Sequence, residues 1–289
     1  LSEQRTGSLT GGIGYSNSAG IFASIGLQES NALGRAWSTN INLNFGEYST
    51  TYNFSLSDPW IKGDKHKTSF RTNVFLSRDY PQEFKSEKNG RIYAVADNTE
   101  SNSADSLSSI VLEKTGGGFA FSRPLNGGDP FNVAKWRVLA GMNFKKVKMI
   151  DGSGNKKPYG DMTPTKGNIN EIICIGFTPN DGSCPAENTL VSFVASTSRN
   201  NLNNSVNPTS GNKLTLGTEQ FFSMGENSPT FNRMRGSYSY FIPIKLINLT
   251  KACRSSGNAA NEDCPQAVGF QFKAGTIIGE LPPYEAYCM

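Results

Sequence analysis

Apolar and polar side chains alternate with a period of two along many short segments of this chain. In the segment 37–45 one face carries Trp37, Thr39, Ile41, Leu43 and Phe45, and the other carries Ser38, Asn40, Asn42 and Asn44. Such alternation predicts a β-strand with two different faces. A soluble sandwich could bury one face of this strand. However, the aromatic residue at each end of the apolar face is more typical of the girdles of a membrane barrel.

The same pattern predicts about eleven strands, most of them near the roughly 9–11 residues that a tilted strand needs to cross a bilayer. We expect them at 6–15, 21–28, 37–45, 51–57, 69–76, 118–123, 134–148, 189–198, 213–222, 232–242 and 268–279. Two long connections, at about 81–114 and 151–188, interrupt a series of short turns rich in Gly, Asn and Pro. Short turns on one side and long loops on the other are typical of outer-membrane barrels.

We therefore expect an all-β protein, a transmembrane antiparallel β-barrel that forms a single partial domain over residues 1–289. An odd number of strands cannot close a barrel without an edge, so further strands should follow Met289. Because the chain begins in mid-pattern with Leu1, we also expect sequence upstream of it.

Composition is compatible with this interpretation and excludes several alternatives. Hydrophobic residues make up 36% of the chain and the mean hydropathy is -0.42, with no apolar run long enough for a spanning helix. A barrel strand averages to mildly polar because its lipid-facing and lumen-facing side chains alternate. The 28 basic and 24 acidic residues are interspersed, so no nucleic-acid partner is indicated.

Cysteine and histidine do not indicate a metal site. Cys174 with Cys184, and Cys253 with Cys264, each bracket a short polar loop and are candidate disulfides of an oxidising compartment, with free thiols as the alternative. His66 is the single histidine, beside two lysines in a turn. The chain has neither a nucleophile elbow nor a phosphate-binding loop, so we expect no enzyme activity and no cofactor.

Several segments resemble one known family. The runs TGSLTGGIGYS at 6–16, NALG at 31–34 and LSDPW at 56–60 resemble the opening strands of the BamA and chloroplast Toc-channel family of outer-membrane insertases, within the bacterial surface antigen superfamily. The turn at 198–211 is similar to one between two mid-barrel strands of that family. LPPYEAYCM at 281–289 resembles the cyanobacterial lead-in to the family's inward-folded loop.

The resemblance implies a sixteen-stranded barrel of which this chain holds the first eleven strands. It implies an assembly factor that inserts and folds β-barrel clients through a lateral gate in the bacterial outer membrane, with the chloroplast outer envelope as the alternative location. Its partners would be unfolded outer-membrane barrel proteins, outer-membrane lipid and accessory assembly proteins. The alternative functions are a two-partner polypeptide secretion channel and a passive pore.

On this basis the first strand is the candidate gate, because an edge strand is a template for an added strand and glycines weaken its packing. The alternative is that its small residues only accommodate a bend. The candidate gate residues are Thr6, Gly7, Ser8, Leu9, Gly11, Ile13 and Tyr15.

Two other groups complete the candidate residues. Arg71, Arg137, Arg233 and Arg235 are predicted to face the lumen, to line a conduit or hold the inserted loop, or else simply to be neutralised by acidic neighbours such as Glu219. The family turn motifs comprise Asp58, Pro59, Trp60, Asn207, Pro208, Gly211, Pro282, Pro283, Tyr284 and Glu285. For residues 58–60, a turn with an interfacial Trp anchor is the simpler interpretation.

Overall fold

The computed structural model describes residues 6–16, 20–47, 49–79, 111–129, 131–150, 156, 160–165, 168–174, 185–225, 228–244 and 266–285, with the backbone alone in 160–165 and 168–174. Eleven of its strands form one antiparallel sheet. In sheet order these are β1 (Gly7–Ser16), β2 (Gly20–Ala32), β3 (Trp37–Gly46), β4 (Ser49–Asp58), β5 (Ser69–Asp79), β6 (Val111–Pro124), β7 (Trp136–Ile150), β10 (Glu187–Asn200), β11 (Gly211–Phe222), β12 (Phe231–Pro243) and β13 (Ala267–Gly279).

The predicted number of sheet strands and their antiparallel order are confirmed, and two boundaries are corrected. The region 151–188, predicted to be a loop, contains the two-stranded hairpin β8 (Gly160–Thr165) and β9 (Asn168–Cys174), and β10 begins at Glu187. The strand predicted from residue 118 begins at Val111, inside the expected loop 81–114, of which 81–110 lies outside the described residues.

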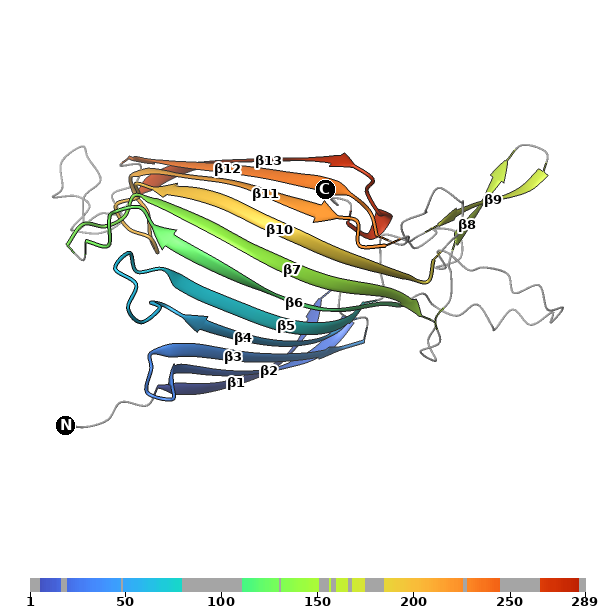
Figure 1. Ribbon diagram of the computed structural model, residues 1–289, viewed down its shortest axis with the longest axis horizontal. Coiled ribbons are helices and arrows are strands. Elements are labelled where there is room, and N and C mark those ends of the chain that lie inside the picture. The colour runs from blue at the N-terminus through green and yellow to red at the C-terminus, as the bar shows by residue number, and fades with distance from the viewer. Residues whose placement is uncertain are drawn as a thin grey trace.

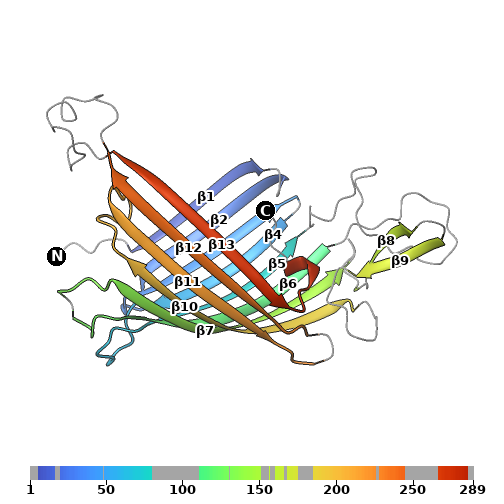
Figure 2. The same ribbon diagram turned by 90° about the horizontal axis from the view of Figure 1, so that it is seen from above.

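The sheet curls strongly without closing (Figures 1 and 2). Among the described strands, β1 pairs only with β2 and β13 only with β12, so each has one free edge. The described chain ends at the 3₁₀ helix η2 (Pro283–Glu285), and Figure 2 shows its C-terminal end inside the curve of the sheet.

Connections leave the sheet alternately at two ends. The connections 17–19, 47–48, 80–110, 151–186 and 223–230 define what we call the long-loop end. The connections 33–36, 59–68, 125–135, 201–210 and 244–266 define the short-turn end. Both predicted long loops leave at one end, which is the extracellular end in outer-membrane barrels. A third long connection, 244–266, departs from the predicted asymmetry because it leaves at the other end.

The buried apolar residues gather near the long-loop end rather than through the middle of the sheet. Leu112, Val147, Met149, Leu190, Phe221 and Phe231 form one cluster against which Ile277 and Tyr284 pack. The Phe221 and Phe231 rings stack with centroids 4.0 Å apart. Within the described part of the chain, no helix is long and apolar enough to cross a membrane.

Candidate functional site

The segment that follows β13 identifies the inner face of the sheet. Tyr284 Oη donates a hydrogen bond to Asn188 Oδ1 at 3.1 Å. Glu285 pairs with Lys145 and, at 3.3 Å, with Arg233. Because this segment lies inside the curve, these wall residues face inward. Strand alternation and the pairing registers then assign a face to the described residues of the sheet outside the irregularity at residues 29–32 of β2.

Glu219 on β11 is the centre of a polar network on this inner face. Its carboxylate accepts hydrogen bonds from Ser192 Oγ at 2.8 Å and from Asn143 Nδ2 at 3.3 Å. It pairs with Arg233 at 2.6 Å and, more loosely, with Arg235 at 3.9 Å. The Glu219 side chain is 8% exposed. A carboxylate with this little water depends on these partners, so the network fixes four strands relative to one another.

Residues 282–285 lie over this network. Pro282 is buried, and Glu285 connects β7 to β12 through its two cationic partners. Burial, with the nearby Glu285 carboxylate, raises the pKa of Tyr284, so its hydroxyl remains a neutral donor. A hollow of about 250 Å³ lies beside the network, lined in part by Asn73, Phe75 and Glu219.

All four predicted arginines face inward, but their surroundings differ. Arg233 has the neutralising neighbour that the sequence suggested, and it also holds the inward segment through Glu285. Arg235 reaches only the edge of ion-pair distance from Glu219. Arg71 and Arg137 have no carboxylate within ion-pair distance among the described residues. Whether any of them lines a conduit stays a prediction.

Sequence reasoning missed the partners of this network. Lys145, Asn143 and Ser192 were recognised only as strand residues, and Asn188 was placed in the predicted loop 151–188. The contact between Lys145 and Glu285 spans 140 residues, and no local pattern signals it. The pairing register of β7 with β10 places all four partners on one face.

The candidate gate strand β1 lies at one edge of the sheet. Gly7, Leu9, Gly11, Ile13 and Tyr15 form its outward face, with Leu9 72% and Ile13 89% exposed. Its unpaired edge presents backbone donors and acceptors, as a strand-addition template requires. Thr6 continues the ladder, since its carbonyl accepts a hydrogen bond from Ser30 N–H.

Packing requires glycine at some positions of β1 but not at others. A Cβ on Gly14 would lie 2.7 Å from the Phe22 ring, so packing explains that glycine. A Cβ on Gly11 or Gly12 would meet nothing closer than 3.8 or 3.7 Å. Close packing therefore does not explain these two glycines. Their main effect is to weaken the strand, because glycine has a low strand propensity.

The first turn motif closes a compact loop. Asp58 Oδ1 accepts a hydrogen bond from Trp60 N–H, and the Trp60 indole donates to the Asp64 carbonyl at 2.8 Å. Hydrogen bonds from Thr68 and from His66 N–H lower the pKa of Asp64 to about 2. β4 ends at Asp58, before Pro59, as predicted. These contacts are those of a structural turn.

The second motif is also a turn. Asn203 Oδ1 accepts hydrogen bonds from the N–H groups of Thr209 and Ser210 on the far side of the loop that contains Asn207 and Pro208. Gly211 has φ +102°, and a Cβ there would lie 2.1 Å from the Asn201 carbonyl oxygen. Only glycine fits this position.

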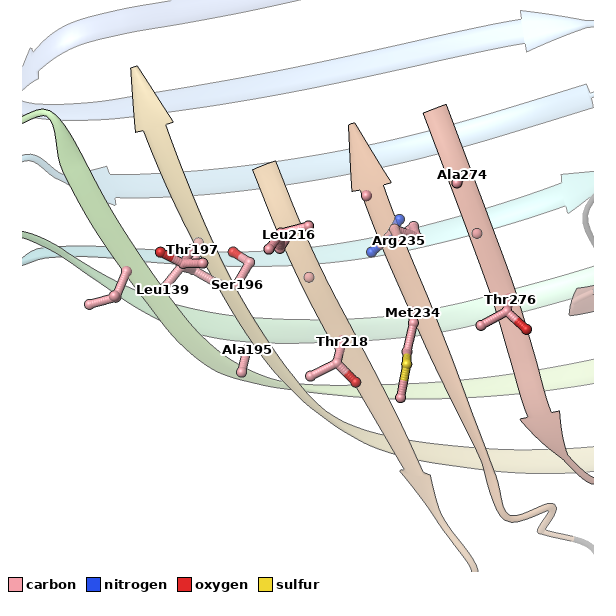
Figure 3. A pocket seen from close by; sticks show the side chains of 14 residues that line it. Leu139, Ala195, Ser196, Thr197, Leu216, Thr218, Met234, Arg235, Ala274 and Thr276 are labelled. Carbon is pink, nitrogen blue, oxygen red and sulfur yellow. The ribbon is translucent and has the colours of Figure 1, made fainter. Parts of the chain in front are cut away.

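A shallow hollow of about 760 Å³ crosses β7, β10, β11, β12 and β13 (Figure 3). Its labelled side chains are mostly small or apolar, such as Ala195, Leu216, Met234 and Ala274, with Arg235 beside them. We see no arrangement of acids, bases or nucleophiles in it that would support catalysis. No cluster of three metal-ligating side chains occurs among the described residues. The candidate disulfides involve Cys184, Cys253, Cys264 and the side chain of Cys174, all of which lie outside the described residues.

Comparison with known proteins agrees with this geometry. The family model described as "Omp85 superfamily domain" matches residues 31–289. The chain is 26% identical over 149 residues to outer envelope protein 80, chloroplastic, of Arabidopsis thaliana, a match that covers 52% of this chain and 17% of that protein. The crystal structure of BamA from Haemophilus ducreyi lacking POTRA domains 1–3 matches with a TM-score of 0.56 and 17% identity, over 99% of this chain and 44% of that one.

The structural match confirms the barrel fold, and the chain spans less than half of either relative. The matched family range begins within β2, so it does not include β1. The family match confirms both the resemblance that the sequence motifs indicated and the outer-membrane location. The chain belongs to the Omp85 superfamily and is an integral β-barrel protein of an outer membrane.

Proposed function

We propose that this chain is part of the barrel of an outer-membrane assembly factor that inserts and folds β-barrel clients along the free edge of β1. Membership of a superfamily of outer-membrane insertases and translocases supports a polypeptide as the substrate. The observation that carries the proposal is the make-up of β1, which pairs on one side only among the described strands: its outward side chains are apolar, and packing does not require two of its glycines.

The edge suits this task for physical reasons. A client strand that pairs with β1 satisfies its backbone groups in a lipid environment that offers no water for them. Because Leu9 and Ile13 face outward, a strand that pairs with β1 would also lie at the lipid surface. No side-chain chemistry, nucleotide or cofactor is needed, since each step exchanges one set of backbone hydrogen bonds for another.

A site-specific photo-crosslinker in the full-length protein tests the proposal. We expect a crosslinker at Ile13 to capture barrel clients during their assembly. The matched control is Val74, an outward residue of β5 that is 56% exposed in the middle of the sheet, and it should capture none. Equal capture at both positions would contradict an edge mechanism.

Depletion of the full-length protein separates the proposal from its rivals. An assembly factor should leave unfolded barrel proteins in the periplasm. Loss of one secreted partner with normal barrel assembly would instead identify a secretion channel. Single-channel conductance with normal growth after depletion would identify a passive pore.

A further inference from the structure

All three tryptophans of the chain lie at the short-turn end of the sheet, and a cation lies over each ring. Arg35 Cζ is 5.2 Å from the centroid of the Trp37 ring. Lys67 Nζ is 5.7 Å from the Trp60 ring, and Arg199 Cζ is 5.7 Å from the Trp136 ring. These pairs come from three separate places along the sheet. We call them the three Trp–cation pairs.

The pairs lie at the boundary of the lipid-facing band. On β3 the outward face runs from Trp37 to Phe45, and on β7 it runs from Trp136 to Phe144. Each span covers eight residue steps, about 26 Å along a strand, which suits the apolar band of a tilted outer-membrane strand. The tryptophans therefore mark one interface, where indole rings are enriched.

Outward cations at the opposite end already pair with carboxylates of the protein. Beyond the band at the long-loop end, Arg78 and Lys148 both pair with Glu113, at 2.8 and 3.3 Å. Lys146 and Lys156 share Glu187 in the same way. Each of these four cations therefore has a protein carboxylate within ion-pair distance.

At the short-turn end the carboxylates mainly accept hydrogen bonds from nearby backbone N–H groups. Glu29 and Asp58 accept hydrogen bonds from backbone N–H groups two residues further along the chain. Asp64 accepts from His66 and Thr68 and pairs with Arg123 at 3.8 Å. Asp129 likewise accepts from Phe131 N–H. None of these carboxylates lies within ion-pair distance of a cation of the three pairs in the described structure.

We propose that the three Trp–cation pairs form a binding surface for the headgroups of anionic lipids in the leaflet at the short-turn end. An indole holds each cation at the interface without neutralising it, and the Asn201 amide oxygen, 3.1 Å from two Arg199 nitrogens, is also uncharged, so the charge of each cation is left to an anionic group. The pairs lie at the start of β3, in the connection 59–68 and across β7 and β10, so a single small soluble anion cannot contact all three. A layer of anionic headgroups reaches all three, and it is present wherever the barrel is inserted.

The test uses the full-length protein in nanodiscs of phosphatidylcholine, with and without phosphatidylglycerol. The triple variant Arg35→Gln, Lys67→Gln and Arg199→Gln removes the cations and keeps the indoles. The control Arg78→Gln, Lys146→Gln and Lys148→Gln removes as many outward cations at the long-loop end. Retention of bound phosphatidylglycerol is measured by native mass spectrometry, and barrel folding by heat-modifiable mobility.

We expect the triple variant to retain phosphatidylglycerol less well by roughly fivefold for each cation removed. The control should retain it as the natural protein does. Unchanged retention in the folded triple variant, or an equal loss in the control, would overturn the proposal. If inorganic phosphate displaces the lipid equally well at millimolar concentration, the surface binds free anions and the assignment to lipid is wrong.

Discussion

The inner wall of the sheet has two halves of opposite chemistry. From β1 to β4 the inward side chains of the described strands are neutral, for example Thr10, Ser24, Asn40, Asn42 and Asn53. From β5 to β13 the inward face carries eight cations and two carboxylates, namely Arg71, Lys114, Arg137, Lys145, Lys213, Arg233, Arg235, Lys273, Asp79 and Glu219.

The difference teaches how one sheet combines a fixed wall with an edge that can open. In the charged half, side chains connect strands that are far apart in sequence, and buried apolar residues support them. In the neutral half, Asn40, Asn42 and Asn44 make no side-chain hydrogen bond to described residues. On the inward face the backbone ladder joins β2 to β3 and β3 to β4, and the ring contact of Phe45 with Tyr52 lies on the outward face. A strand near the free edge can separate there without leaving a charge unpaired.

Removal of the Glu219 carboxylate should give the largest difference in stability between the two halves. Glu219→Ala leaves Arg233, whose side chain is 18% exposed, beside a space that its main counter-charge has left. We expect a loss of about 2–4 kcal/mol in the free energy of unfolding, because a largely buried charge loses the nearer of its two carboxylate partners and keeps only Glu285. Unfolding in urea, followed by heat-modifiable mobility in detergent, measures it. The control Asn42→Ala in the neutral wall should cost under about 1 kcal/mol, and equal losses would show that the halves do not differ.

Glycines give a second contrast between the halves. A Cβ at Gly141 on β7 would lie 2.4 Å from the Phe119 carbonyl oxygen, whereas one at Gly12 on β1 meets nothing within 3.7 Å. We expect Gly141→Ala to destabilise the barrel by about 1–3 kcal/mol, since backbone must move. Gly12→Ala should be neutral or stabilising by about 0.5 kcal/mol, because alanine restricts the unfolded chain. The same urea titration tests both, and a costly Gly12→Ala would show that the edge is closely packed.

The anchored segment offers a local test of the charged half. Glu285→Gln weakens the pairs with Lys145 and Arg233 but leaves the side chain's size unchanged. We expect the segment to open more often, by about 2 kcal/mol or roughly thirtyfold. Hydrogen exchange at Glu285 N–H, which donates to the Pro282 carbonyl at 3.0 Å, reports this opening. If exchange there is unchanged while β1 amides exchange faster, the segment acts on the edge and the two halves are coupled.

Much of the sheet could be predicted because period-two alternation is local. It assigned the inward face of all four arginines, and it placed Trp37 and Phe45 at the two ends of an outward face. The start of β6 was missed because Glu113 and Lys114 look like loop residues. In the structure they extend the sheet beyond the lipid band, where Glu113 pairs with Arg78 and Lys148, and Lys114 with Asp79.

The network at Glu219 could be predicted only in part. The sequence indicated Glu219 as a neutralising neighbour because it lies on the inward face of β11, close to the arginines of β12. Glu285 was indicated as part of a family turn motif, but its partner Lys145 could not be, because a 3₁₀ helix after β13 has no strand register to align the two residues. Long-range side-chain contacts of this kind depend on how far the sheet curls, which alternation does not encode.

The smallest expected effect is the pH dependence of the connection 59–68, which holds the Trp60–Lys67 pair and joins the two halves of the wall. Because the pKa of Asp64 is lowered to about 2 by hydrogen bonds from Thr68 and His66, its stabilising effect is present above the unfolded pKa of about 4 and is lost as the pH falls toward 2. The indole of Trp60 bonds to the Asp64 backbone, so its fluorescence should stay constant down to about pH 4 and change below it. Asp64→Asn should show the altered fluorescence at neutral pH with the barrel still folded. A change centred near pH 4 in the natural protein would mean that the carboxylate is not held by these hydrogen bonds.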